Sequence, residues 1–360
     1  MLRYLITCLL LSYLAGGHSE SLESAVWHSS DYLHQHPRQR LLMEQFLGTV
    51  KAPATPLPNS PLTPVRIAVV LPEATGKAQG RVLLTAFKAR MKALHINYRL
   101  DTYEYPAQAT DQSLFDQYAA ALVSSPDYLI TTLGGFQQRQ LIASILAGHS
   151  TKVILYDVTV PVKAWENHPP LLYVGVDYRL GISQLARYLD RELAASAVVA
   201  AIMLPAGYES QLRCDEFINA MSALGRTVRG IYYHDGSLTT RQNVKAALES
   251  QTPPDFLFNC ANRVAVYGDS QGAMALVPSN RWEDAVALSK RPLQAHEVAL
   301  VTLFDDIEIA MAETIRNDIE QHVTPNLFVA DIWLMSWEQG ASLDAQDGRH
   351  LPKAEVWQNN

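Results

Sequence analysis

Short apolar segments that alternate with helical patterns constrain the fold of this chain more than any other feature. The first such segment is Ile67–Leu71, and the fourth is Lys152–Tyr156. Each is rich in β-branched residues and is followed by polar residues or proline, which is typical of a buried parallel strand. The same alternation starts again at Leu171. The sequence therefore predicts an α/β protein with two successive units of similar size.

The predicted strands divide between these two units. The first unit has four, at Ile67–Leu71, Asn97–Tyr105, Asp127–Leu133 and Lys152–Tyr156. The second has six, at Leu171–Val174, Val198–Leu204, Thr227–Tyr233, Asp255–Asn259, Val298–Leu303 and Leu327–Leu334. We expect two doubly wound, Rossmann-like lobes joined by a hinge of three crossovers. The expected boundaries are 66–160 with 303–324 for the first lobe and 161–302 with 325–337 for the second, followed by a tail over 338–360.

The composition supports a globular protein. Of the 360 residues, 48% are hydrophobic and 18% are charged, so a large core can form. The formal net charge is −7 and no basic block occurs. This charge balance argues against a nucleic-acid partner.

The first residues have the pattern of a secretory signal peptide. Arg3 supplies a positive charge, Tyr4–Leu14 is mainly apolar, and Ala15–Gly17 offers small residues for cleavage. We therefore predict a signal peptide over 1–17 and an exported protein; the alternative is an N-terminal membrane anchor. Residues 18–65 are predicted to form a helix followed by a proline-rich lead along the surface.

Two cysteines remain after the predicted cleavage. Cys214 and Cys260 follow strands that we expect to be neighbours in the second lobe. In an exported protein two such cysteines either form one disulfide or serve as small buried apolar residues. The sequence leaves both interpretations open.

Ligands of open α/β sheets bind beyond the carboxyl ends of the strands, so the polar residues at these ends are candidates for a binding site. Arg213 is the most informative, because it lies in the first turns of a helix after a predicted strand; it can instead pair on the surface with Glu209 or Asp215. The other ligand-binding candidates are Asp157, Thr75, Lys77, Asn262, Arg263 and Thr302. This polar set of mixed charge favours a small hydrophilic ligand.

Enzyme chemistry is only weakly indicated. Gly268–Gly272 matches the G-x-S-x-G pattern of a nucleophile elbow, with Ser270 as the nucleophile of a serine hydrolase. The match follows the strand at Asp255–Asn259 by only a few residues, where this architecture needs a helix. No phosphate-binding glycine loop or cluster with metal-ligand spacing occurs. We therefore predict no catalytic residue, metal or cofactor.

Several segments carry a resemblance to a known family. They are Leu94–Tyr98, Ser125–Ile130, Pro161–Trp165, Leu172–Asp177 and Asp305–Glu313. With them, residues 27–333 resemble the LuxP family of periplasmic autoinducer-2 receptors, within the type I periplasmic binding proteins. The resemblance implies a two-lobed, non-enzymatic receptor in the periplasm. Such a receptor closes on a small ligand and regulates a membrane-bound sensor kinase in quorum sensing, as LuxP does with LuxQ.

The ligand-binding positions of that family match this chain only in part. Arg213 stands at one of the family's ligand arginines, and Asp157 stands where the family has Asn. Thr302 replaces the second arginine, which in the family helps to neutralise a borate diester. Thr75 and Lys77 lie near the family's Gln and Ser, and Asn262-Arg263 replaces Thr-Asp. These departures predict an altered ligand choice, and leave a solute-binding protein of a sugar-type ABC importer as the alternative function.

Overall fold

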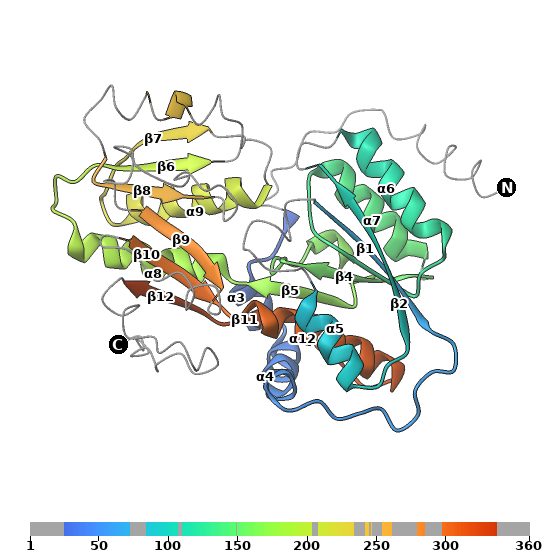
Figure 1. Ribbon diagram of the computed structural model, residues 1–360. Helices are drawn as coiled ribbons and strands as arrows, with labels where there is room; N and C mark the ends of the chain where they lie inside the picture. Colours follow the sequence, from blue (N-terminus) through green and yellow to red (C-terminus); the bar gives the residue numbers. More distant parts are fainter. Residues whose placement is uncertain are drawn as a thin grey trace.

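The computed structural model describes residues 25–72, 84–106, 110–148, 150–203, 208–233, 242–244, 246, 254–260, 279–284 and 297–336. Within these residues the chain forms two lobes, each built on a six-stranded sheet (Figure 1). The predicted signal peptide over 1–17 and the tail over 338–360 lie outside the described residues. No helix in the described segments is long and apolar enough to cross a bilayer.

The first lobe is a parallel sheet covered on both faces. Its strand order is β11-β5-β4-β3-β1-β2, with neighbours paired in parallel. The strands are β1 (Val65–Pro72), β2 (Tyr98–Tyr105), β3 (Tyr128–Thr131), β4 (Lys152–Tyr156), β5 (Leu172–Val176) and β11 (Leu327–Ala330). The helices are α5 (Thr85–Ala93), α6 (Asp111–Val123), α7 (Phe136–Gly148) and α12 (Phe304–Ile319).

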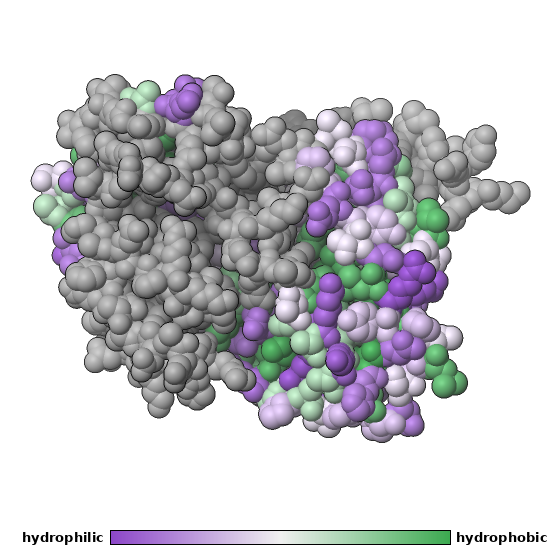
Figure 2. Space-filling view, viewed as in Figure 1, coloured by the Kyte–Doolittle hydropathy of each residue, from purple (hydrophilic) through white to green (hydrophobic). Residues whose placement is uncertain are grey.

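Strand β1 shows why the sheet needs helices on both sides. Ile67 and Val69 belong to a core cluster shared with α5 and α12, whereas Ala68 and Val70 belong to a second cluster shared with α6 and α7. Successive strand residues point to opposite faces of the sheet. An unbroken apolar run therefore makes both faces apolar, and both must be covered by helices. On the outer face of this lobe, hydrophilic residues interleave with small groups of hydrophobic ones (Figure 2).

The second lobe repeats this arrangement with one reversed strand. Its order is β12-β10-β9-β8-β6-β7, in which only the pairing of β12 with β10 is antiparallel among the described pairs. The strands are β6 (Val199–Met203), β7 (Val228–Tyr233), β8 (Phe256–Asn259), β9 (Ser279–Asp284), β10 (Glu297–Thr302) and β12 (Ile332–Ser336). Helices α8 (Tyr178–Glu192) and α9 (Tyr208–Ala223) pack against each other beside this sheet.

Three strands differ from the sequence-based expectation. The strand near Leu171–Val174, expected to open the second lobe, is β5 and pairs with β4 in the first sheet. The single strand expected over Leu327–Leu334 is divided at Asp331 between β11 and β12, one in each sheet. Strand β9 was not predicted at all. An apolar run shows that a strand exists, but the pairing partner depends on contacts far away in the sequence.

These pairings define the hinge. The chain passes between the lobes at Asp177, between β5 and α8; at Leu303, between β10 and α12; and at Asp331, between β11 and β12. Two doubly wound lobes joined by three crossovers agree with the predicted fold class. The hinge therefore consists of single residues between elements that are fixed in one lobe or the other.

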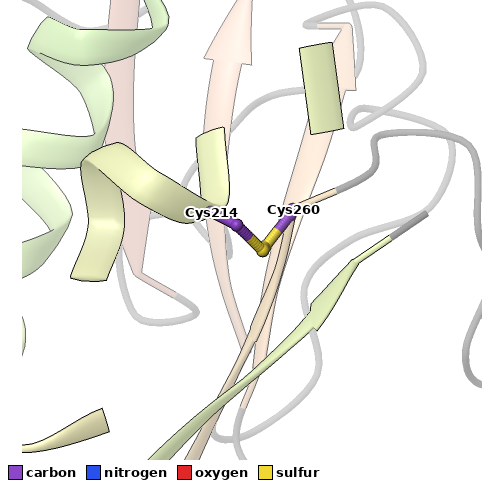
Figure 3. Close-up of a disulfide and its surroundings, with 2 residues drawn as sticks. All are labelled: Cys214 and Cys260. Atoms are coloured by element: carbon purple, nitrogen blue, oxygen red, sulfur yellow. A yellow bond between two sulfur atoms is a disulfide. The ribbon is translucent and has the colours of Figure 1, made fainter. Parts of the chain in front are cut away.

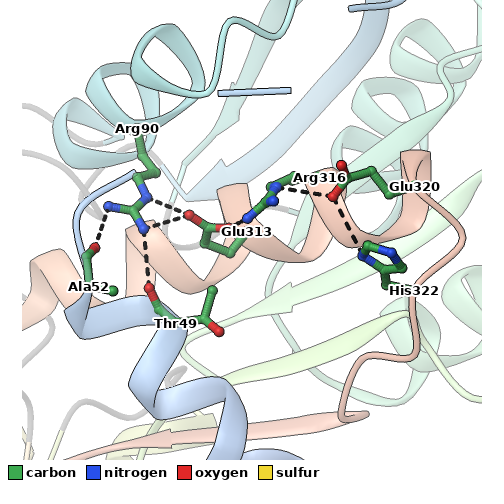
Figure 4. Close-up of polar contacts among 7 residues, drawn as sticks. All are labelled: Thr49, Ala52, Arg90, Glu313, Arg316, Glu320 and His322. Carbon is green, nitrogen blue, oxygen red and sulfur yellow. Dashed lines mark hydrogen bonds and ion pairs between the residues drawn. The ribbon is translucent and has the colours of Figure 1, made fainter. Parts of the chain in front are cut away.

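The N-terminal segment packs on the first lobe. Helices α3 (Ser29–Gln35) and α4 (Pro37–Lys51) are followed by the proline-rich lead, in which Leu57 is buried. The ring of Phe46 meets that of Phe328 edge-on, with centroids 5.8 Å apart. Arg90 of α5 joins this segment to α12: its guanidinium donates to the carbonyls of Thr49 and Ala52 and to the Glu313 carboxylate (Figure 4).

The two cysteines of the second lobe form a disulfide (Figure 3). Cys214 lies on α9 and Cys260 directly follows β8, with 5.2 Å between their Cα atoms. This spacing is normal for a disulfide. Both residues are fully buried beside the stacked rings of Phe217 and Phe258, whose centroids are 4.0 Å apart. The bridge therefore ties a covering helix to a central strand.

Candidate ligand-binding site

Asp157 follows β4 at the edge of the first sheet that faces the second lobe. Its backbone is left-handed, with φ of 59°, a conformation that Asp and Asn adopt more readily than most residues. The bend brings its backbone against Gly175 of β5, where a Cβ atom would lie 2.9 Å from the Val158 nitrogen. The absence of a side chain at Gly175 therefore allows the backbone at Asp157 to pack closely against β5, and Asp157 itself is buried, with 7% of its surface exposed.

Arg213 reaches the same place from the second lobe. It is buried on α9, and its guanidinium lies 3.6 Å from the ring centroid of Tyr178, the first residue of α8. A guanidinium over an aromatic face gains a cation–π attraction that increases when water is excluded. The Tyr178 hydroxyl donates to Asp157 Oδ1 at 2.6 Å. Tyr178 therefore orients both the cation and the anion of the site.

The Arg213–Asp157 pair spans the two lobes without a direct hydrogen bond. Arg213 Nη2 and Asp157 Oδ2 are 3.9 Å apart, which is within ion-pair range but longer than the 2.7–3.2 Å typical of a hydrogen bond. A ligand hydroxyl placed beside both atoms can accept from the guanidinium and donate to the carboxylate. The arrangement is therefore suited to ligands that carry hydroxyl groups.

A cavity of about 90 Å³ lies next to this pair. Its walls come from the first lobe, from the start of α8 and of α9, and from the N-terminal segment. The lining residues are Val26, His28, Ser29, Leu133, Asp157, Val158, Thr159, Val160, Asp177, Tyr178, Arg179, Ile182, Leu212, Arg213 and Glu216.

The charges around the cavity are largely paired with one another. Arg179 Nε lies 3.0 Å from Glu216 Oε1, in addition to the Arg213–Asp157 pair. The remaining carboxylate, Asp177, accepts from the Ser29 hydroxyl and from the Leu180 N–H at the start of α8. The described walls thus hold three carboxylates and two guanidiniums, which disfavours an anionic ligand.

The predicted site residues fall into three groups. Arg213 and Asp157 meet at the cavity. Thr302 is buried at the hinge, where its hydroxyl donates to the carbonyl of Asp331 at 2.8 Å, and it does not line the cavity. Thr75, Lys77, Asn262 and Arg263 lie outside the described residues, as does Ser270.

Sequence reasoning missed several lining residues. Tyr178 and Arg179 follow a strand end, but that strand was placed in the wrong sheet. His28 and Ser29 precede both lobes in the sequence, and no local pattern connects them to a cleft formed by later residues. Among the described residues no group of His, Cys, Asp or Glu has the arrangement of a metal site.

Comparison with known proteins supports this description of the fold. No protein-family model matches the chain. An ABC transporter solute-binding protein from Agrobacterium vitis, solved with α-D-tagatopyranose, shares 14% identity at a TM-score of 0.60, covering 77% of this chain and 96% of that one. A periplasmic solute-binding protein from Actinobacillus succinogenes, solved with D-allose, shares 16% identity at a TM-score of 0.58, covering 78% and 100%.

A third similar structure is a chain of the XylFII–LytSN complex. It shares 14% identity at a TM-score of 0.57, covering 77% of this chain and 99% of that one. Identities this low define a common fold only. With two doubly wound lobes, three crossovers and a cavity at the hinge, this chain has the type I periplasmic binding protein fold. The solved proteins of that fold to which it is similar include periplasmic, sugar-binding components of ABC transporters.

Proposed function

We propose that this protein is an exported binding protein that closes its two lobes on a small, uncharged, polyhydroxylated ligand. The observation that carries the proposal is the buried Arg213–Asp157 pair, which joins the lobes across a gap that one hydroxyl can bridge. A ligand that bridges the gap stabilises the closed form by its differential affinity for that form. Binding and closure are thereby coupled at a single pair of side chains.

Of the roles expected from the sequence, delivery of a sugar-like solute to an ABC importer has the better support. Two of the similar solved proteins are transporter components that were solved with monosaccharides. The charge balance of the described cavity walls also argues against a borate diester, the anionic form of autoinducer-2 expected from the LuxP-like resemblance. A serine hydrolase using Ser270 receives no support from these binding proteins.

The second candidate is a receptor that regulates a LuxQ-like sensor kinase. It is favoured by the N-terminal segment, which packs on the first lobe beside the hinge, and by the similarity to a chain solved in a complex with a second component. Crosslinking of the protein to membranes of the native cell, followed by mass spectrometry, distinguishes the two roles. Capture of a permease supports the importer, and capture of a kinase supports the receptor.

Ligand binding itself is tested by calorimetric titration and thermal shift. The panel contains D-allose, D-tagatose, D-arabinose, D-galactose, and autoinducer-2 with and without borate; native mass spectrometry identifies any molecule that purifies with the protein. We expect binding of an uncharged polyol. Arg213→Lys should weaken it at least tenfold, because one ammonium cannot reproduce the guanidinium fork.

Arg187→Lys is the matched control for this experiment. Arg187 is an exposed arginine of α8 that does not line the cavity, and its substitution should leave the affinity unchanged. A protein that binds no member of the panel and releases no small molecule would contradict the proposal. Tight binding of only the borated ligand would contradict the preference for an uncharged one.

A further inference from the structure

The N-terminal segment enters the cavity from outside both sheets. Val26 forms an antiparallel bridge with Val162, and the Trp27 N–H donates to the Pro161 carbonyl at 2.8 Å. The Lys163 ammonium lies 4.8 Å from the Trp27 ring centroid. These contacts attach the segment to the short connection after β4, which includes the 3₁₀ turn η2 (Lys163–Trp165). The segment is therefore held in place before α3 begins.

Ser29 then fixes the segment to the hinge. Its side-chain hydroxyl donates to Asp177 Oδ2 at 2.5 Å, and the residue is 5% exposed. Asp177 is the first crossover between the lobes and the N-cap of α8, where its Oδ1 accepts from the Leu180 N–H at 3.2 Å. One carboxylate thus joins the N-terminal segment to the helix that carries Tyr178. The position of the segment is thereby linked to the position of the site.

His28 lies between these two attachments and lines the cavity. It precedes α3 with an extended backbone and makes no side-chain cap to that helix. A neutral imidazole offers one N–H donor and one nitrogen acceptor, which suits hydroxyl groups on a ligand. In the cavity wall, His28 is thus a polar residue of the N-terminal segment, whereas Arg213 and Asp157 come from the two lobes.

We infer that Val26–Ser29 forms a third wall of the ligand site, in which His28 contacts the ligand and Ser29 is a positioning residue. The inference rests on the proposed binding function and assigns a specificity-determining role to a segment outside both lobes. Since Arg213 and Asp157 recognise a single hydroxyl, the third wall discriminates between ligands that differ elsewhere. His28 should therefore affect the choice among sugars, beyond any effect on overall affinity.

The experiment compares two pairs of substitutions on the same segment. His28→Ala is matched by His34→Ala, an exposed histidine of α3, and Ser29→Ala by Ser30→Ala, an exposed serine directly beside it. The probes are the panel sugars that bind the wild type, with any co-purifying molecule added as a further probe. Dissociation constants and thermal unfolding of the ligand-free protein are measured for each variant.

We expect His28→Ala to weaken the best probe about tenfold and to change the ratio of affinities between the two best probes at least fivefold. Ser29→Ala should weaken binding about three- to tenfold, with a smaller change in that ratio. Both control variants should match the wild type. A merely structural role for His28 would lower ligand-free unfolding temperature and leave the affinity ratio unchanged, and that result would overturn the inference.

The same data separate this inference from the proposed function. If the wild type binds a probe and His28→Ala binds it with the same affinity and selectivity, the inference about the third wall is wrong and the proposed binding function stands. If the wild type binds no probe and releases no small molecule, the binding function is wrong and the inference is overturned with it.

Discussion

Asp157 has two roles at the residue scale, one in its backbone and one in its charge. Its left-handed φ of 59° turns the chain at the end of β4, and its carboxylate faces Arg213. Asparagine tolerates the same backbone conformation and fills nearly the same volume without the charge. The two roles can therefore be separated by substitution.

We predict that Asp157→Asn weakens ligand binding at least tenfold, because the charged acceptor is lost, and also lowers the free energy of unfolding, because the buried guanidinium of Arg213 loses its carboxylate partner. Asp157→Ala should lower the free energy of unfolding by about 1–2 kcal/mol more than Asp157→Asn does, since alanine is strained in the left-handed region. Urea unfolding and calorimetric titration of both variants measure these effects. Equal stability of the two variants would contradict the role given to the backbone.

The site was only partly predictable from its residues. Asp157 and Arg213 are candidates because ligands of α/β sheets bind beyond strand ends, a rule that needs only the approximate position of each strand, and the structure places both beside the cavity. Tyr178 required the correct sheet for β5, and His28 required the path of a segment that precedes both lobes. Such contacts join residues far apart in the sequence, and no local spacing encodes them.

At the scale of elements, Arg90 determines how α4 is held. Its guanidinium donates to two carbonyls at the C-terminal end of α4 and to the fully buried carboxylate of Glu313 on α12. A cation at this end of a helix also complements the helix dipole. One side chain of α5 therefore satisfies groups on two other helices.

Removal of Arg90 should destabilise the protein. We predict that Arg90→Ala lowers the free energy of unfolding by about 3 kcal/mol, because a buried carboxylate loses a partner and two carbonyls lose their donor. Arg316, 3.4 Å from Glu313, limits the loss. The control is Arg99→Ala, since the Arg99 side chain is 71% exposed in its pair with Asp101 and should contribute less than about 1 kcal/mol. Urea titrations measure the free energy of unfolding of both variants. Equal losses in Arg90→Ala and Arg99→Ala would refute this account.

Asp306, in the first turn of α12, should make stability depend on pH. Its pKa is raised to about 6: burial has the largest effect, Lys51 opposes it, and the neighbouring carboxylates of Asp331 and Asp305 add to the rise. A carboxyl with a raised pKa in the folded state favours folding while it is protonated. Its contribution is therefore complete below about pH 4 and is lost as the pH rises through about 6.

We predict that Asp306→Asn removes this loss, so that the variant gains on the order of 1 kcal/mol relative to the wild type between pH 4 and pH 7. Thermal unfolding of both proteins across that range gives the difference directly. If the unfolding temperatures of the wild type and the variant change with pH in parallel, Asp306 has a similar pKa in the folded and unfolded states, which would contradict the prediction.

Element types were easier to predict than element partners. Four strands of the first unit and the helices between them followed from apolar periodicity, because each must bury its own apolar face. The division of residues 327–336 between two sheets did not follow, since both halves are apolar and only Asp331 interrupts them. Strand β9, Ser279–Asp284, reads SNRWED and carries no apolar pattern that would predict a strand.

At the scale of the molecule, the two lobes differ in covalent reinforcement. The Cys214–Cys260 disulfide closes a loop with a sequence separation of 46 within the second lobe. We predict that the double variant Cys214→Ala/Cys260→Ala destabilises this lobe by about 2–4 kcal/mol. Scanning calorimetry should show its transition at lower temperature while that of the first lobe is retained. A common shift of all transitions would indicate that the lobes unfold as one unit.

The division of the last strands between the lobes has a consequence for biosynthesis. Strand β11 covers the edge of β5 in the first sheet, and β12 covers the edge of β10 in the second. A chain that has not yet emerged from the ribosome beyond residue 326 therefore has two incomplete sheets, each with an open edge. Helix α4 also lacks one of its packing partners until β11 is present, because Phe46 of α4 packs against Phe328 of β11. Folding of both sheets is thus completed only after residues 327–336 have been synthesised.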